Sequence, residues 1–483
     1  MSTLPAVLRN TFVLLAGTAA AKALVFVSYL ILARQLEPAD FGRYSLVFAY
    51  LAFFELLPDA GLDPIAVRES AARPARMAAM MGHALAVRAS LGLVVLALAI
   101  GVAPAGVGGT QAHLLVALGA ITWVTSNRRA SLRSVLDTPY RVTLSMGTPT
   151  ALGVGSELLH VAILLPLIAA HGLAGAVAAQ GLAPIPFLVL LAWWTSRRVA
   201  PRIAWAPREW ARLVRVAAPL LVGLLLNVVL VRSDVLMLQH LRGAIDVGLY
   251  AAPVRIVEIA NLLPALLMAS IFPLFAANHP GDPEHVRRLF RTSLAALAIV
   301  LVPVVLVQSF AAGAIIRLCF GDAFAGAATA LPWLAAAEVF VFADIVLTAC
   351  FLATGREKRN VQCVAVAAVA NVGLNLWAIP HWGAAGAAAT TFAAYVVRAA
   401  MSFAFRDTRT AGLDTFAATF PSVAIGTTAA GGALLLADTP LARSLTALCL
   451  AAGLAVVFRR RLFGPLADAW RLARPRPGAP PAA

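Results

Sequence analysis

The sequence predicts an all-α protein that crosses a membrane many times, through about fourteen transmembrane helices. Three observations lead to this prediction. Of the 483 residues, 61% are hydrophobic and only 12% are charged, whereas soluble globular chains carry roughly 25% charged residues. The apolar residues form long runs, and a helix needs about 20 of them to cross the hydrocarbon core. The basic residues gather in alternate connections between these runs, which is typical of polytopic membrane proteins.

The apolar runs give the predicted spans in order. The run at about 10–33 is longer than the core of a signal peptide, so we expect it to remain as the first helix. The first series of spans lies near 10–33, 41–58, 82–104, 111–127, 145–168 and 173–196. The second series lies near 216–238, 248–277, 292–316, 327–353, 361–380 and 384–405, and two further spans lie near 413–437 and 441–458.

The basic residues predict the orientation of these spans. With the N-terminus inside, most of the 38 lysines and arginines lie in the connections on the inner side. This positive-inside bias predicts an inner-membrane protein with both termini in the cytoplasm. Because topology accounts for the formal net charge of +16, we expect no nucleic-acid partner.

An internal repeat indicates that the two series of spans are duplicates. Residues 41–58 recur at one constant offset as residues 247–264, with glycine, tyrosine and a Leu-Leu-Pro sequence at matching positions. Residues 172–176 recur in the same way as residues 383–387. An even number of helices separates the copies, so we expect two pseudo-symmetric lobes related by an axis along the membrane normal, with a cleft between them.

This duplication predicts the following division of the chain. The parts are a first six-helix lobe (1–201), an interfacial linker (202–218), a second six-helix lobe (219–410), two extra transmembrane helices (411–458) and a basic, Pro/Ala-rich cytoplasmic tail (459–483). Tryptophan and arginine at helical spacing in the linker predict a helix in the headgroup layer. Ordinary anchoring there competes with a specific anionic-lipid site. The composition of the tail predicts disorder.

A family resemblance rests on the start of the chain. The carrying residues are Leu32-Ala33-Arg34-Gln35-Leu36-Glu37-Pro38-Ala39-Asp40-Phe41-Gly42-Arg43-Tyr44-Ser45, followed by Asp59-Ala60-Gly61-Leu62 and Val67-Arg68-Glu69. They resemble the opening of bacterial Wzx-type polysaccharide flippases. Asp234 with residues 247–250, and Asn371 and Asn375 with residues 379–387, resemble later helices of that family.

The resemblance implies the fold of the multidrug/oligosaccharidyl-lipid/polysaccharide exporter (MOP) superfamily. It also implies a polyprenyl-pyrophosphate-linked oligosaccharide as substrate, flipped from the cytoplasmic to the outer leaflet for export of a cell-surface polysaccharide such as O-antigen or exopolysaccharide. The implied partners are membrane lipids, the polymerase and other proteins of the assembly pathway.

Catalysis is not expected from this sequence. We find no Gly-rich phosphate loop, no His/Cys cluster with metal spacing and no long aqueous connection, so we predict neither an enzyme nor a bound metal or cofactor. A drug/cation antiporter of the same fold is the main alternative, for which an anionic cleft is expected. A membrane polymerase or ligase, the other alternative, would need a large outside loop.

Charges within the spans are the candidate functional residues, because a charged side chain near the bilayer centre is costly and usually faces a wet interior. Basic groups can bind a pyrophosphate through charge-assisted hydrogen bonds. The predicted cationic cleft consists of Lys22, Arg232, Arg255 and Arg398. Snorkelling to the inner interface is the favoured alternative for Arg398.

Acidic residues within the spans are the candidates for coupling transport to H+ or Na+. They are Asp234, Glu258, Glu157, Glu338 and Asp344. Pairing of Arg255 with Glu258 along one helix face is an alternative for that acid. Pairing with a residue of another helix is the alternative for the acids that have no basic residue one turn away. We expect alternating access of the two lobes, driven by an ion gradient or by the membrane potential.

Overall fold

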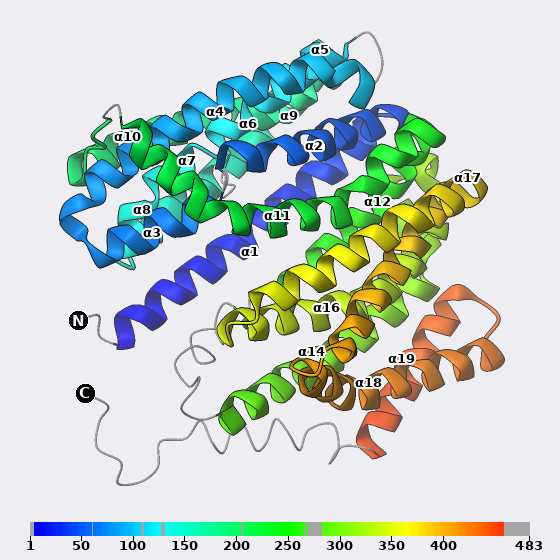
Figure 1. The fold of residues 1–483 in the computed structure, drawn as a ribbon. Helices are drawn as coiled ribbons and strands as arrows, with labels where there is room; N and C mark the ends of the chain where they lie inside the picture. Colours follow the sequence, from blue (N-terminus) through cyan, green and yellow to red (C-terminus); the bar gives the residue numbers. More distant parts are fainter. Residues whose placement is uncertain are drawn as a thin grey trace. The chain divides into compact units, whose positions relative to one another are not determined.

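The computed structural model describes residues 4–59, 61–107, 111–126, 131–203, 206–264, 267–268 and 283–457. Most of these residues are helical, and none of them lies in a strand (Figure 1). The helices of the first half are α1 (Leu4–Gln35), α2 (Pro38–Asp59), α3 (Leu62–Ala72), α4 (Met77–Gly106), α5 (Ala112–Ala120), α6 (Thr122–Thr125), α7 (Arg133–Leu136), α8 (Thr138–Val142), α9 (Gly147–Leu182), α10 (Ile185–Arg198) and α11 (Pro207–Leu241). Those of the second half are α12 (Ala244–Ala260), α14 (Pro283–Phe310), α15 (Ala312–Phe320), α16 (Leu331–Ala353), α17 (Glu357–Ala404), α18 (Arg409–Leu436) and α19 (Pro440–Val457). Two 3₁₀ helices, η1 (Pro74–Arg76) and η2 (Asp322–Thr329), complete the described elements.

The helices confirm the predicted fold class. Among the described residues, 10 helical stretches are long and apolar enough to cross a membrane. Two of them, Gly147–Arg198 and Glu357–Ala404, contain 52 and 48 residues, which is enough for two crossings of about 20 residues each. Two shorter apolar helices lie at Ala112–Thr125 and Pro440–Ala455. The chain is therefore a multi-pass membrane protein, and the predicted count of about fourteen spans is consistent with these helices.

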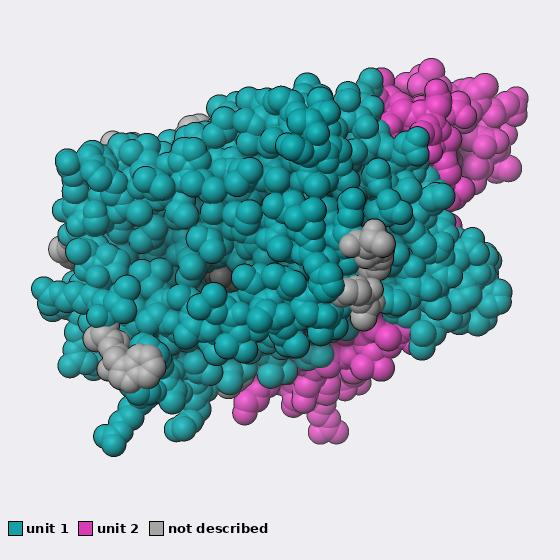
Figure 2. All heavy atoms as spheres, turned by 90° about the horizontal axis from the view of Figure 1, so that it is seen from above, with its two compact units in different colours: residues 1–255, 375–384 teal, residues 256–374, 385–483 magenta. Residues whose placement is uncertain are grey.

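The described chain forms two compact units, coloured separately in Figure 2. The first unit comprises residues 1–255 and 375–384, and the second comprises residues 256–374 and 385–483. This division of the chain does not test the predicted lobes and the two predicted extra helices, which remain predictions. The predicted tail, and the last part of the predicted eighth span, lie outside the described residues.

The two copies of one repeated motif have the same backbone conformation. Gly172 has φ 55° and ψ −132°, and Gly383 has φ 54° and ψ −130°. Glycine reaches positive φ without the steric penalty of a Cβ. Each glycine breaks a long helix between two predicted spans. This agreement is what a duplication predicts.

The copies of the other repeated motif contact each other at their glycines. A Cβ added to Gly42 of α2 would lie 2.0 Å from the carbonyl oxygen of Ala244 at the start of α12. A Cβ added to Gly248 of α12 would lie 2.0 Å from the carbonyl oxygen of Pro38 at the start of α2. Because the contact is reciprocal, a larger residue at either position would force the two helices apart.

The predicted linker is continuous with the seventh span. Helix α11 begins at Pro207 and runs without a break into the apolar stretch that starts at Leu221. Leu213 and Ala217 of its first part are buried in a hydrophobic cluster with residues of α3 and α4. Packing against α3 and α4 therefore fixes the start of α11, and its predicted place in the headgroup layer stays a prediction.

Candidate functional site

Lys22 is exposed in the middle of a membrane-spanning helix. It belongs to α1, within the apolar stretch Val13–Gln35, and its side chain is accessible rather than packed inside the first unit. A lysine facing lipid at this depth is unfavourable by about 3 kcal/mol or more. The accessible surface around Lys22 is therefore expected to be wet.

A second cation lies on the same face of α1. The guanidinium of Arg255, from α12, lies 4.1 Å from the centroid of the Tyr29 ring, and Arg255 is only 7% exposed. Lys22 and Tyr29 are seven positions apart, which places them on one helix face, about 10 Å apart along the axis. Arg255 thus contacts α1 about two turns from Lys22, and their joint role as basic residues of a cleft stays a prediction.

Arg232 and Asp234 lie near each other in sequence on α11, with different environments. Arg232 is half-buried, whereas Asp234 is 2% exposed. The Tyr250 hydroxyl of α12 donates a short hydrogen bond to Asp234, and the Val235 amide donates to Asp234 Oδ1 at 2.8 Å. Asp234 therefore also connects α11 to α12.

Arg398 is buried in an ion pair, which corrects the snorkelling alternative. Its guanidinium pairs with the carboxylate of Asp344 of α16 and donates to Thr348 Oγ1 at 3.0 Å, and Arg398 is 4% exposed. The arginine does not reach the interface because a carboxylate of another helix holds it inside the second unit. Asp344 therefore has an ion-pair partner on another helix, which is one of the predicted alternatives.

Glu338 of α16 is fully buried in the second unit, at 0% exposure. Neither carboxyl oxygen has a hydrogen bond of normal geometry, although the Gln308 amide of α14 is near enough to interact with it. Among the described residues, no basic group forms an ion pair with Glu338. An ionised carboxylate is costly in such surroundings.

Glu157 lies in a polar cluster of the first unit. Its Oε2 atom is 3.8 Å from Nδ1 of His160, one turn along α9. Ser28 Oγ of α1 is 3.3 Å from the same His160 nitrogen. Glu258, the remaining predicted acid, is half-buried on α12, and its predicted pairing with Arg255 remains a prediction.

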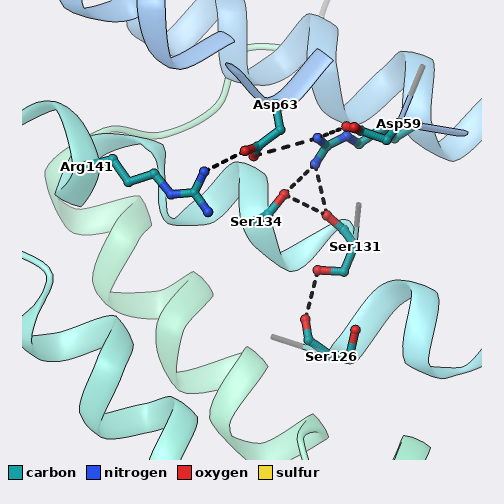
Figure 3. A network of polar contacts seen from close by, with 7 residues as sticks. Asp59, Asp63, Ser126, Ser131, Ser134 and Arg141 are labelled. Carbon is teal, nitrogen blue, oxygen red and sulfur yellow. Dashed lines mark hydrogen bonds and ion pairs between the residues drawn. The ribbon is translucent and has the colours of Figure 1, made fainter. Parts of the chain in front are cut away.

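A network that the sequence did not reveal surrounds Arg88 of α4 (Figure 3). Arg88 pairs with Asp59 at the end of α2 and lies 3.8 Å from Asp63 of α3. Asp63 also accepts a 2.6 Å hydrogen bond from Arg141 of α8. Arg88 further donates to Ser134 Oγ at 2.7 Å and to the carbonyl of Ser131 at 2.9 Å. The two acids are four residues apart in the sequence, a spacing that could have signalled a common partner.

The network fixes five helices of the first unit. Arg88 is 2% exposed, Asp59 4% and Asp63 7%, so the charges that Arg88 shares with the two acids are removed from solvent, whereas Arg141 stays partly exposed. Removing one partner of such a pair leaves an uncompensated buried charge. The Arg88 network is therefore a structural element, in contrast to the exposed Lys22.

Outside the apolar stretches, Asp137 extends the polar region between α7 and α8. Burial raises the pKa of Asp137 to about 6, against the opposing effects of Arg133 and Arg141. Burial also lowers the pKa of Arg133. Asp137 thus titrates close to neutral pH.

The basic side chains of this site have the chemistry to bind an anion. Lys22 and Arg255 can donate charge-assisted hydrogen bonds to phosphate oxygens. The described residues contain no group of three or more His, Cys, Asp or Glu side chains that could hold a metal ion.

Comparison with solved structures places the fold. An inward closed structure of the lipid II flippase MurJ matches with a TM-score of 0.75 at 10% identity, covering 94% of this chain and 100% of that one. An inward-facing multidrug resistance MATE family transporter of the MOP superfamily matches with a TM-score of 0.68 at 16% identity, covering 82% and 95%. A MOP superfamily transporter from Pyrococcus furiosus, described as having a binding pocket of reversed polarity, matches with a TM-score of 0.59 at 15% identity, covering 88% and 96%.

Comparison by sequence places the family. No curated protein matches the chain significantly. Residues 7–279 match the family described as polysaccharide biosynthesis protein, and this range is more than half of the 483 residues. The chain therefore belongs to the polysaccharide biosynthesis protein family and has the fold shared by MurJ and the MATE transporters.

Proposed function

We propose that this protein is a flippase that moves a polyprenyl-pyrophosphate-linked oligosaccharide from the cytoplasmic to the outer leaflet of the bacterial inner membrane. The family match, and the fold it shares with a lipid II flippase, support this proposal. In this proposal both termini are cytoplasmic, and the exported product enters a cell-surface polysaccharide such as O-antigen or exopolysaccharide.

The observation that carries the proposal is the exposed lysine at mid-span. Lys22 is accessible within an apolar helix, and Arg255 lies over Tyr29 on the same helix face. Lys22 and Tyr29 are about 10 Å apart along the axis of α1, and in this proposal Lys22 and Arg255 both contact the pyrophosphate and replace its hydration shell. The lipid tail can meanwhile stay in the bilayer.

Arg232 and Arg398 have different roles within this proposal. Arg232 is half-buried on α11 and is retained as a substrate-binding candidate. Arg398 is committed to Asp344, so a substrate phosphate would have to compete with a buried carboxylate. We therefore place Lys22 and Arg255 ahead of the other two.

Transport by alternating access needs an energy source, for which we propose H+ or Na+ coupling. Glu338 is the leading candidate for proton binding because it is fully buried without an ion-pair partner among the described residues. The remaining candidates are Asp234, Glu258, Glu157 and Asp344. The membrane potential would also act on a charged headgroup, by about 2.3 kcal/mol per elementary charge at 100 mV.

A drug/cation antiporter is the second candidate function, since MATE transporters share the fold. An antiporter for cations should present acids where its ligand binds. The face of α1 that carries Lys22 presents cations instead, which favours an anionic substrate. A polymerase or ligase with this fold would need a catalytic site, and we identify no candidate set of catalytic residues in the described part of the chain.

The experiment is a flipping assay in proteoliposomes with a fluorescent polyprenyl-pyrophosphate oligosaccharide. Lys22→Ala and Arg255→Ala should each lower the flipping rate at least tenfold, while insertion and thermal stability stay unchanged for Lys22→Ala. Lys22→Arg keeps the charge and should retain most of the rate. Unchanged flipping in both alanine variants would remove the cationic site from the proposal, and export of a cationic drug by the wild type would favour the antiporter.

A further inference from the structure

A charged pocket lies in the first unit, away from the face of α1 that carries Lys22. Its volume is about 650 Å³, and it lies where α3 ends and where α4 and α11 begin. It is lined by Glu69, Ala72, Arg73, Arg76, Ala79, Met80, His83, Glu209 and Arg212. Four basic or imidazole side chains and two carboxylates therefore share one concave surface.

One arginine, Arg212, binds both carboxylates of the pocket. Arg212 donates to both oxygens of Glu69 of α3, at 3.1–3.3 Å. It also donates to both oxygens of Glu209, at 2.6 and 2.9 Å. These hydrogen bonds lower the pKa of Glu209 and raise that of Arg212, so both groups stay ionised at neutral pH. Arg212 thus binds both carboxylates of the pocket and offsets one of their two negative charges.

Arg73 and Arg76 supply positive charge without such a partner. Both are exposed, at the two ends of the short segment that contains η1. Among the described residues, no carboxylate forms an ion pair with either arginine. The pocket therefore keeps two guanidinium groups with unused donors and a net positive charge.

His83 adds a hydrogen-bond donor to the pocket, and its contact with Trp210 decides which ring nitrogen carries the hydrogen. The indole N–H of Trp210 donates to Nδ1 of His83 at 3.3 Å. With Nδ1 as the acceptor, the neutral ring carries its hydrogen on Nε2. His83 lines the pocket, so this N–H is a third hydrogen-bond donor for an anion.

The position of the pocket identifies its ligand class. Apolar spans begin at Pro74 and at Leu221, so the pocket lies where two spans meet the membrane interface. Phosphates of lipid headgroups lie in this layer, where basic residues attract anionic lipids. Ala72, Ala79 and Met80 add an apolar wall that suits the glycerol and upper acyl chains.

We propose that this pocket binds the phosphate group of an anionic phospholipid, with Arg73 and Arg76 as its main contacts and His83 as an additional donor. The pocket would hold the start of α11 against α3 and α4 through the lipid as well as through Arg212. This site does not depend on the identity of the transported substrate.

The test measures lipid binding to the purified full-length protein in a neutral detergent. Phosphatidylglycerol and zwitterionic phosphatidylcholine are titrated separately, with binding followed by native mass spectrometry and by thermal stability. The wild type should prefer phosphatidylglycerol. The double variant Arg73→Gln/Arg76→Gln should weaken this binding at least tenfold, because it removes the two guanidinium groups that donate charge-assisted hydrogen bonds to the phosphate.

A matched control separates the pocket from general surface charge. Arg208 and Arg215 are exposed on the same first part of α11 but do not line the pocket. The double variant Arg208→Gln/Arg215→Gln loses the same charge and should bind phosphatidylglycerol as the wild type does. Both double variants should unfold at the wild-type temperature without lipid, because the four arginines are exposed.

The outcomes distinguish the possible phosphate sources. Inorganic phosphate and pyrophosphate are titrated in the same way, and stronger stabilisation by either than by phosphatidylglycerol would support the phosphate site but assign it to a soluble anion. No preference of the wild type for any phosphate anion over phosphatidylcholine would overturn the proposal. Equal losses in the two double variants would also overturn it, since the binding would then come from diffuse charge.

Discussion

Two sets of buried acids, one in each unit of the molecule, are compensated differently. In the first unit, Asp59 and Asp63 share the guanidinium of Arg88, and Asp63 has Arg141 as a second partner. In the second unit, Glu338 is fully buried and has no hydrogen bond of normal geometry. The arginines of the first unit neutralise the two aspartates. The carboxyl group of Glu338 has no such partner among the described residues to stabilise its ionised form.

The comparison separates two uses of polar residues in an apolar chain. A compensated pair stays charged and joins helices, and it is damaged mainly by losing one partner. A lone acid within a membrane helix is expensive to keep ionised, so it has a physical reason to exchange a proton when its surroundings become wet. We therefore assign the Arg88 network to folding and propose Glu338 for coupling.

The largest expected effect comes from breaking the Arg88 network. Arg88→Met should lower the free energy of unfolding by about 3–5 kcal/mol, because Asp59 and Asp63 would remain buried with less compensation. Thermal unfolding in detergent measures this loss. Arg43→Met, which removes an exposed arginine paired with Asp40, should change stability by less than about 1 kcal/mol.

A double variant sharpens the same prediction. Asp59→Asn/Arg88→Met removes both charges of the closest pair, so it should be more stable than Arg88→Met alone. If Arg88→Met unfolds like the wild type but cannot flip its substrate, the network belongs to transport rather than to folding, and the comparison fails.

Asp137 gives an intermediate, pH-dependent effect. Its pKa in the folded state is raised from 3.8 to about 6, so the folded protein binds this proton more tightly than the unfolded chain does. The ionised carboxylate therefore destabilises the fold above pH 6, and this loss disappears as the pH falls from about 6 towards 3.8. Asp137→Asn should be more stable than the wild type at pH 7.5, by up to about 3 kcal/mol.

Unfolding of both proteins across pH 4 to 8 checks the Asp137 prediction, with the difference between them as the observable. The difference should shrink as the pH falls. A difference that is constant with pH would mean that Asp137 has an ordinary pKa and that its region is wetter than its burial indicates.

The smallest expected effect on stability belongs to Glu338. Glu338→Gln keeps the shape of the side chain and removes a charge that has no ion-pair partner among the described residues, so it should change stability by less than about 1 kcal/mol. Flipping should nevertheless lose its response to an imposed proton gradient. Glu338→Asp keeps a carboxyl group and should retain part of that response; a full response in Glu338→Gln would transfer the coupling role to another acid.

Much of the fold could be predicted from the sequence, and less of the candidate site. The breaks at Gly172 and Gly383 fall between predicted spans and share one backbone conformation, because local sequence decides where a helix can turn. Lys22 is exposed, and its predicted place in a cleft stays a prediction. Arg398 was expected to snorkel, which failed because Asp344 lies on another helix and no spacing along the chain signals it.

The sequence by itself determined the class of protein, its helical spans and its internal repeat, because the thickness of the bilayer sets the length of an apolar helix and glycine sets where the backbone can bend. Only the tertiary structure decided which charges compensate one another. Arg88 and Asp59 are 29 residues apart, Arg141 and Asp63 are 78 apart, and the Arg73–Arg76 segment meets α11 across the pocket. Electrostatic partners are chosen by distance in space, and helix packing alone brings these residues within reach.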